Sequence, residues 1–239
     1  MANLYGRTWT REELASRIGK ESQLGGVRLG QYDDGNARGA RYAEVDTGSG
    51  LAYTVLLDRG MDVGVVRYNG ASLVWESPTG PVHPAYFEPE GRGWLRTFHG
   101  GMVVTCGMTT AGAATIEDGE DLGLHGRISH TPAANVWADG AWRGDEYEMF
   151  VRGKMRQAVV FGENLLMDRR IWSRLGESRL MIRDVVTNEG YETTPHMLLY
   201  HVNFGFPLLD EGTTLLAPSR SVTPRDEVAA PGLDVEIVL

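Results

Sequence analysis

The chain has 239 residues, with 23 Lys and Arg against 32 Asp and Glu, and so carries a formal net charge of −9. This acidic balance argues against a nucleic-acid-binding protein, because phosphate recognition needs a basic face. No run approaches the 18 apolar residues of a membrane helix, and the N-terminus has no apolar signal region. We therefore expect a cytoplasmic protein without nucleic-acid or membrane partners. Its one cysteine, Cys106, lies in an apolar run and is expected to be a small buried hydrophobe.

The N-terminal segment, residues 1–25, contains a short predicted helix. Thr10 and Glu13 have the spacing of a capping box, and Leu14 and Ile18 share one helical face. Gly19 stands where a left-handed residue would end the helix. The sequence therefore predicts a helix over residues 10–19.

The rest of the chain, residues 26–239, has the pattern of an all-β domain. Strand-like runs cover residues 51–57, 63–68 and 71–75, with Asn69-Gly70 as a hairpin turn between the last two. Three more runs cover 165–172, 180–186 and 197–204. Because no helical pattern separates these runs, we expect an antiparallel β-sandwich or barrel. The edge strands of an open sandwich need covering, which makes a homodimer plausible.

The six histidines do not have the spacing of a metal site. There is no H-x-H, no H-E-x-x-H and no cysteine partner. His201 is more informative, because period-2 alternation places it beside Asn203 on one face of a mostly apolar strand. Such a polar pair either finds partners in the core or faces a cavity. We therefore expect neither a metal nor a cofactor.

Two loop segments supply further candidates. His125 lies between glycines in Gly123-Leu124-His125-Gly126-Arg127, where little shields its side chain. Arg59 and Asp62 follow a strand and flank Gly60, which suggests a backbone conformation that a side chain would disfavour. These two residues are either part of a site or a structural Arg–Asp pair around a turn. Asp58 and Asp62 could instead act as paired carboxylates. Because Arg59 is adjacent, we prefer ion pairing with Arg59.

Taken together, five motifs make the chain resemble a family. The sequence is similar to the aldose 1-epimerase (galactose mutarotase-like) superfamily, in a branch of uncharacterised function of the DUF4432 type. The resemblance runs from about Gly26 to Asp226 and is carried by Asp58-Arg59-Gly60-Met61-Asp62, Leu73-Val74-Trp75-Glu76-Ser77, Gly100 to Gly107, Leu124-His125-Gly126-Arg127 and Tyr200 to Leu209. It implies a large antiparallel β-sandwich of the mutarotase type with a sugar cleft on one sheet.

The resemblance also implies roles for individual residues. His125 matches the histidine that contacts the sugar, and His201 matches the histidine that gives a proton to the ring oxygen. The glutamate that removes the proton from the anomeric hydroxyl has no counterpart here, so we expect the chain to be incomplete at its C-terminus, with a Glu or Asp base beyond Leu239.

The sequence thus predicts a cofactor-independent aldose 1-epimerase that acts on a carbohydrate by general acid–base catalysis. Arg59 and Arg127, if they face the cleft, would suit an acidic sugar such as a uronate. Asp62 and Asn203 are further candidates for substrate contacts, and Trp75 could stack on a pyranose face. The alternatives are another sugar isomerase or lyase on the same fold, or a sugar-binding protein without turnover.

Overall fold

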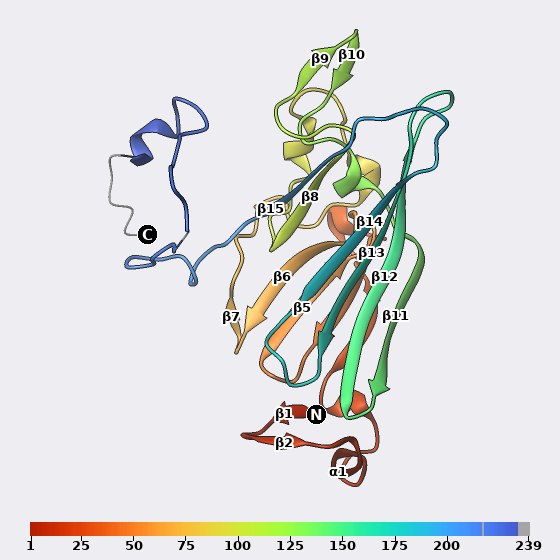
Figure 1. The fold of residues 1–239 in the computed structure, drawn as a ribbon, viewed down its shortest axis with the longest axis vertical. Coiled ribbons are helices and arrows are strands. Elements are labelled where there is room, and N and C mark those ends of the chain that lie inside the picture. Colours follow the sequence, from red (N-terminus) through yellow and green to blue (C-terminus); the bar gives the residue numbers. More distant parts are fainter. Residues whose placement is uncertain (217, 234–239) are drawn as a thin grey trace.

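We describe a computed structural model of the protein, which covers residues 1–216 and 218–233. Two β-sheets dominate the fold and pack face to face (Figure 1). One sheet has seven strands, ordered β15 (Met197–Val202), β8 (Val103–Met108), β6 (Asp62–Tyr68), β5 (Leu51–Leu56), β4 (Arg41–Asp46) and β3 (Gly26–Gln31), with β7 (Ala71–Ser72) paired to β6. The other has four strands, β11 (Ala134–Arg143), β12 (Glu146–Ala158), β13 (Asn164–Arg174) and β14 (Met181–Asn188). The predicted antiparallel β-sandwich is confirmed.

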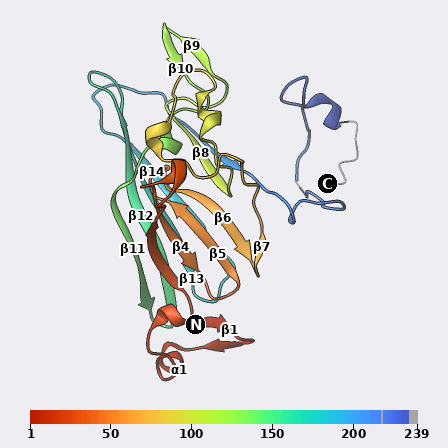
Figure 2. The same cartoon turned by 180° about the vertical axis from the view of Figure 1, so that it is seen from behind.

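Short elements surround the sandwich. The hairpins are β1 (Ala2–Leu4) with β2 (Arg7–Trp9), and β9 (Thr115–Glu117) with β10 (Glu120–Leu122). The 3-10 helices are η1 (Glu21–Gln23), η2 (Gly35–Ala37), η3 (Pro84–Tyr86), η4 (Gly93–Arg96), η5 (Ile128–His130) and η6 (Ala230–Leu233). Seen from behind, the N-terminal hairpin lies at one end of the sandwich and β9–β10 at the other (Figure 2). No helix of the described residues is long and apolar enough to cross a membrane.

The predicted N-terminal helix is present as α1 (Arg11–Ala15), and its capping box is formed. The Thr10 side chain accepts a hydrogen bond from the Glu13 N–H, and the Glu13 carboxylate accepts one from the Thr10 N–H. The prediction that the helix reaches Gly19 is wrong, because its C-cap is Ser16. So short a helix needs tertiary support, which the buried Leu14 provides.

The core lies between the two sheets and follows the alternation of their strands. Along β13 every second residue is buried, from Leu165 to Ser173. Val45 on β4, Tyr53 on β5 and Val63 on β6 face it from the seven-stranded sheet. The hairpin turn at Asn69-Gly70 is also as predicted, with both residues at positive φ.

The outer face of the seven-stranded sheet, which points away from the four-stranded sheet, is covered at the β8 end by the loops that follow β7 and β8. A second buried cluster forms there, with Val104 and Cys106 of β8 packed beneath Trp94 and the half-buried Phe98. Cys106 is completely buried, as predicted, and burial raises the pKa of its thiol to about 12. These loops carry the candidate site.

The strand β15 lies at the edge of the seven-stranded sheet, next to β8. The register places His201 opposite Val104 and Tyr200 opposite Thr105. Since directly paired residues point to the same face, His201 lies on the outer face with the second cluster and Tyr200 on the core face. Several apolar side chains of β15 are exposed, including Leu199 and Val202. A homodimer through this edge remains a prediction.

Candidate functional site

His125 and His201 meet on the outer face of the seven-stranded sheet. Their ring centroids are 5.7 Å apart and the ring planes cross at 73°. His201 comes from β15, and its ring also contacts the Phe98 ring edge-on at 5.6 Å. Its Nδ1 is buried and has no hydrogen-bond partner among the described residues. The predicted convergence of a loop histidine and a strand histidine is therefore present.

The position of His125 depends on an unusual backbone. His125 itself has a φ of +60°, and Gly126 follows with a φ of +72°. A Cβ at position 126 would lie 2.4 Å from the Gly107 carbonyl oxygen, so only glycine fits. The loop is tied to β8 because the Gly107 N–H donates to the His125 carbonyl and the Arg127 N–H donates to the Gly107 carbonyl. A rigid connection to the sheet thus holds the imidazole in place.

The electrostatics of His125 favour the neutral ring. Its Nδ1 accepts a hydrogen bond from the Gly112 N–H at 3.3 Å, which leaves the proton on Nε2. Burial lowers the pKa of His125, and the neighbouring His201 lowers it further. A neutral imidazole with its N–H at Nε2 is a hydrogen-bond donor for a ligand oxygen.

Aromatic side chains line the same place. Trp94 contacts His125 edge-on at 4.8 Å and stacks on Phe98 at 4.7 Å. Trp75 lies 5.8 Å from Phe98 and is 44% exposed. An exposed indole is a surface on which the apolar face of a sugar ring can stack. Phe98 lies between Trp75 and His201, and the stacking role of Trp75 stays a prediction.

Two other predicted contact residues lie near the pair but differ in availability. The Asn203 side-chain amide donates to the Gly101 and His201 carbonyls, so it fixes the end of β15. Arg127 is exposed, and its side chain forms no hydrogen bond or ion pair within the described part of the chain. It lines a small hollow with Gln157 and Glu163 that neither site histidine lines, and its contact with an acidic sugar stays a prediction.

Arg59 does not face the cleft, so its predicted role in binding an acidic sugar is wrong. The side chain is 2% exposed, and its guanidinium donates to the carbonyl oxygens of Ser129, Val82 and Thr97 and contacts His130 Nε2. Burial lowers the pKa of Arg59 to about 10. The guanidinium thus connects three separate segments, at Val82, Thr97 and Ser129, by side-chain hydrogen bonds.

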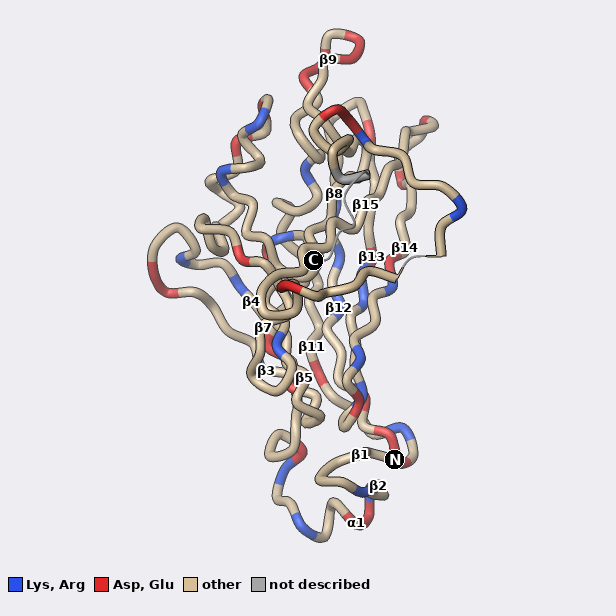
Figure 3. Tube along the Cα trace, turned by 90° about the vertical axis from the view of Figure 1, so that its left-hand side faces the viewer, with Lys and Arg blue, Asp and Glu red and all other residues tan. Residues whose placement is uncertain are grey.

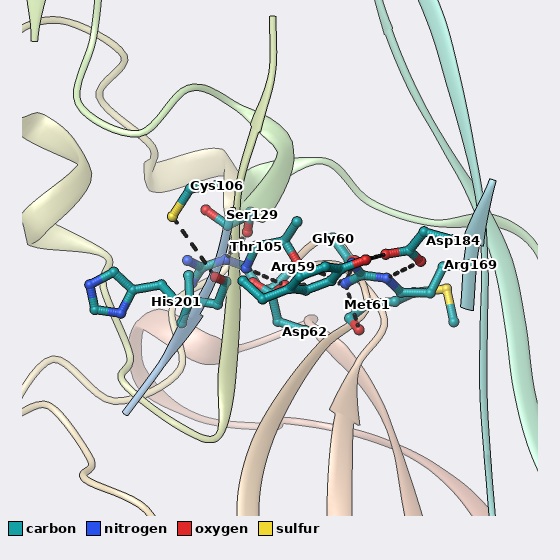
Figure 4. Close-up of polar contacts among 12 residues, drawn as sticks. Arg59, Gly60, Met61, Asp62, Thr105, Cys106, Ser129, Arg169, Asp184 and His201 are labelled. Atoms are coloured by element: carbon teal, nitrogen blue, oxygen red, sulfur yellow. Dashed lines mark hydrogen bonds and ion pairs between the residues drawn. The ribbon is translucent and has the colours of Figure 1, made fainter. Parts of the chain in front are cut away.

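Asp62 also lies beneath the surface rather than in the site. It is completely buried, accepts a hydrogen bond from the Thr105 N–H and lies 3.5 Å from the Arg169 guanidinium (Figure 4). The predicted pairing with Arg59 is wrong, because Asp58 pairs with Arg41 and Asp62 with Arg169, both from distant parts of the chain. Neither is a pair with Arg59.

The buried cluster around Arg169 was not predicted from the sequence. This guanidinium binds the Asp184 carboxylate through two hydrogen bonds of 2.8 Å and also donates to the Thr105 hydroxyl (Figure 4). Asp184 in turn accepts a hydrogen bond from the Tyr200 hydroxyl. Because Tyr200 precedes His201, the cluster fixes β15 from the core side while the imidazole faces outward. The one sequence signal for this cluster is the alternation of β13, which places Arg169 among apolar core positions.

Known proteins give the family of this fold. The family described as a domain of unknown function, DUF4432, matches residues 37–236. The chain belongs to the DUF4432 family. The mutarotase-like superfamily predicted from the sequence is thereby supported, with DUF4432 as its branch. No curated protein matches the chain.

A solved structure has the same architecture. A "putative aldose 1-epimerase" from Klebsiella pneumoniae subsp. pneumoniae MGH 78578 superposes with a TM-score of 0.75 at 27% identity, over 86% of this chain. The match covers 57% of that protein, so this chain spans little more than half the length of its structural neighbour. Galactose 1-epimerase from Lactobacillus acidophilus NCFM matches at a TM-score of 0.38 and 15% identity, over 61% of this chain and 44% of that one. The fold is that of mutarotase-like β-sandwiches.

Proposed function

We propose that the protein is a cofactor-independent carbohydrate epimerase that interconverts the anomers of an aldose. The observation that carries the proposal is the pair of imidazoles 5.7 Å apart on the outer face of the sheet, with Phe98 between His201 and the exposed Trp75. The fold shared with the Klebsiella protein supports it. The substrate is proposed to be a carbohydrate, and the exposed Arg127 would favour an acidic one.

In this proposal His201 gives a proton to the ring oxygen of the sugar. The bond between C1 and the ring oxygen breaks, while a base takes the proton from the C1 hydroxyl and a C1 carbonyl forms. Rotation about the C1–C2 bond followed by the reverse steps closes the ring as the other anomer, so atoms and protons balance without a cofactor. The Nε2–H of His125 holds and polarises a sugar oxygen during these steps.

The general base that this proposal requires is not identified among the described residues. Within residues 1–216 and 218–233, neither imidazole forms a hydrogen bond or ion pair with a carboxylate. The same observation favours a second candidate function, a sugar-binding protein without turnover. Sugar binding with no anomer exchange would select that candidate.

NMR exchange spectroscopy on the α and β anomers of glucose and galactose tests the proposal. Because positioned acid–base groups contribute about 10²–10⁴-fold, His201→Ala is expected to lower the catalysed rate by that factor. His83→Ala is the matched control, since His83 lies in the loop before η3 and its ring contacts the Ala85 N–H instead of either site histidine. A His201→Ala variant that exchanges anomers at the wild-type rate would refute the role of His201.

A further inference from the structure

The outer face of the seven-stranded sheet has a second depression, of about 400 Å³, over β3 to β6. The strand register explains its shape. Gly26, Asp46 and Ala52 are cross-strand neighbours in one row, and Arg28, Glu44 and Thr54 in the next. The depression is lined by the small residues Gly26 of β3 and Ala52 and Thr54 of β5. Its volume is in the range of small-molecule sites in proteins.

Charged side chains of both signs surround this depression. Arg28 and Glu44 belong to one row, and Asp46 and Arg67 to the other. All four are exposed, and within the described residues none of them forms an ion pair. Asp46 Oδ1 accepts from the Gly48 N–H and Arg67 Nη1 donates to the Gly70 carbonyl, which leaves the other oxygen and the other N–H groups for the hydroxyl groups of a ligand.

The outer face of the other sheet is different. Lys and Arg recur along its strands, as the blue segments of β12 and β13 show (Figure 3). There Arg152 pairs with Asp168, and both Arg143 and Arg170 pair with Glu148. A larger hollow, of about 730 Å³, lies on that face. Because most of the charge around it is satisfied by these ion pairs, the depression over β3 to β6 is the better ligand site.

A small cavity of about 20 Å³ joins the depression to the loops of the histidine site. Thr54 and Val65 line both hollows. His99 also lines the cavity; it is 4% exposed, and neither ring nitrogen has a hydrogen-bond partner among the described residues. A buried imidazole without partners is costly, so a ligand hydroxyl that enters this cavity would gain a hydrogen bond to one of its ring nitrogens. The cavity is large enough for one such group.

Two residues connect the cavity to the surroundings of the histidine pair. Gly101, which lines it, accepts a hydrogen bond from the Asn203 amide and donates to the Trp75 carbonyl. Phe98, next to His99 in the chain, contacts the His201 ring. From β15 to β5 there are three strand spacings, about 14 Å at roughly 4.8 Å each. The depression, the His99 cavity and the histidine pair therefore lie in sequence across the sheet, over a distance that an extended ligand can span.

We propose that the depression over β3 to β6 is a distal sugar-binding subsite, and that the ligand is an oligosaccharide with its reducing end at His125 and His201. The inference rests on the proposed function, whose substrate class it names. Glu44 and Asp46 accept hydrogen bonds from hydroxyl groups of the distal unit, while Arg28 and Arg67 donate to its oxygens. A hydroxyl or hydroxymethyl group of the intervening unit occupies the His99 cavity.

Anomer exchange of glucose, maltotriose and cellotriose tests the subsite. We expect at least one trisaccharide to have a KM about tenfold below that of glucose. Arg67→Ala should raise the ratio of trisaccharide KM to glucose KM about tenfold, and Glu44→Gln should act in the same direction. Arg183→Ala, on the four-stranded sheet, is the control and should leave the ratio unchanged. Equal KM values for glucose and both trisaccharides, or a ratio unmoved in both Arg67→Ala and Glu44→Gln, overturns the subsite.

Saturation-transfer NMR with the same trisaccharides separates this inference from the proposed function. If no sugar undergoes anomer exchange, the epimerase proposal fails, yet trisaccharide binding that is lost in Arg67→Ala still supports the subsite. If glucose is exchanged but trisaccharide binding is the same in wild type and Arg67→Ala, the epimerase proposal stands and the subsite is refuted.

Discussion

The imidazoles of His125 and His201 come from a loop and from an edge strand, and their rings cross nearly perpendicularly at a centroid distance of 5.7 Å. The loop histidine is held by a hydrogen bond from the Gly112 N–H to its Nδ1. That contact requires an unprotonated Nδ1, so protonation of His125 opposes the folded loop.

Because protonation of His125 disfavours the folded loop, we expect acid to lower the stability of the protein. Because burial and His201 lower the folded-state pKa of His125 below the unfolded value near 6.5, its contribution to stability is present above pH 6.5 and is lost as the pH falls through the folded pKa. His125→Asn keeps a residue that tolerates positive φ and removes the titration. In urea denaturation, the wild type should lose stability relative to His125→Asn between pH 7 and pH 5. A constant difference across this range would contradict the assignment.

Arg59 and Arg127 are predicted to differ sharply when each is replaced by methionine. Arg59→Met leaves three buried carbonyl oxygens without their donor, which should cost about 3–5 kcal/mol of unfolding free energy. Arg127→Met changes an exposed residue and should stay within about 0.5 kcal/mol of the wild type. Chemical denaturation of both variants measures the difference. Similar losses in the two variants would show that Arg59 does not hold the loops together.

For Asp62 we predict a dependence of stability on pH with the opposite sign to that of His125. Burial raises the folded-state pKa of Asp62 to about 6, against an opposing effect of Arg169, while the unfolded value is near 3.9. The folded state therefore prefers the protonated acid, and this contribution is full below pH 3.9 and lost as the pH rises through 6. Asp62→Asn can still accept from the Thr105 N–H and does not titrate.

The wild type should accordingly lose on the order of 2–3 kcal/mol of stability relative to Asp62→Asn between pH 4 and pH 7.5, as about two pKa units imply. Guanidinium denaturation at several pH values measures this change. A wild type that gains stability over Asp62→Asn as the pH rises would mean that the ion pair with Arg169 outweighs burial.

Trp75 should contribute to sugar binding without contributing to stability. Its indole is 44% exposed beside Phe98, so Trp75→Ala removes a stacking surface and little core packing. An aromatic contact of about 1 kcal/mol corresponds to a several-fold rise in sugar KM. Trp137→Ala is a matched control, because Trp137 is 58% exposed on the other sheet. If Trp137→Ala raises the KM as much as Trp75→Ala, stacking at Trp75 does not explain the effect.

Local patterns predicted much of the secondary structure. Residues 51–57, 63–68 and 165–172 became β5, β6 and β13, because alternation and β-branched residues suit a half-buried pleated surface. The strands β3, β4 and β8 were not predicted. In β8 all six residues are buried, which removes the alternation that a strand shows when only one face is covered.

The sequence by itself determined the all-β class, the capped helix at Thr10, the turn at Asn69-Gly70 and the two histidines as candidates, because these depend on neighbours in the chain. Tertiary structure alone decided that Arg59 is buried while Arg127 is exposed. It also decided that Arg169 and Tyr200 both bind Asp184, and that the His99 ring lines a small cavity with no hydrogen-bond partner in the described part of the chain. A guanidinium or an imidazole carries no local signal of its surroundings, since its burial and its partners depend on residues that the fold brings from distant parts of the chain.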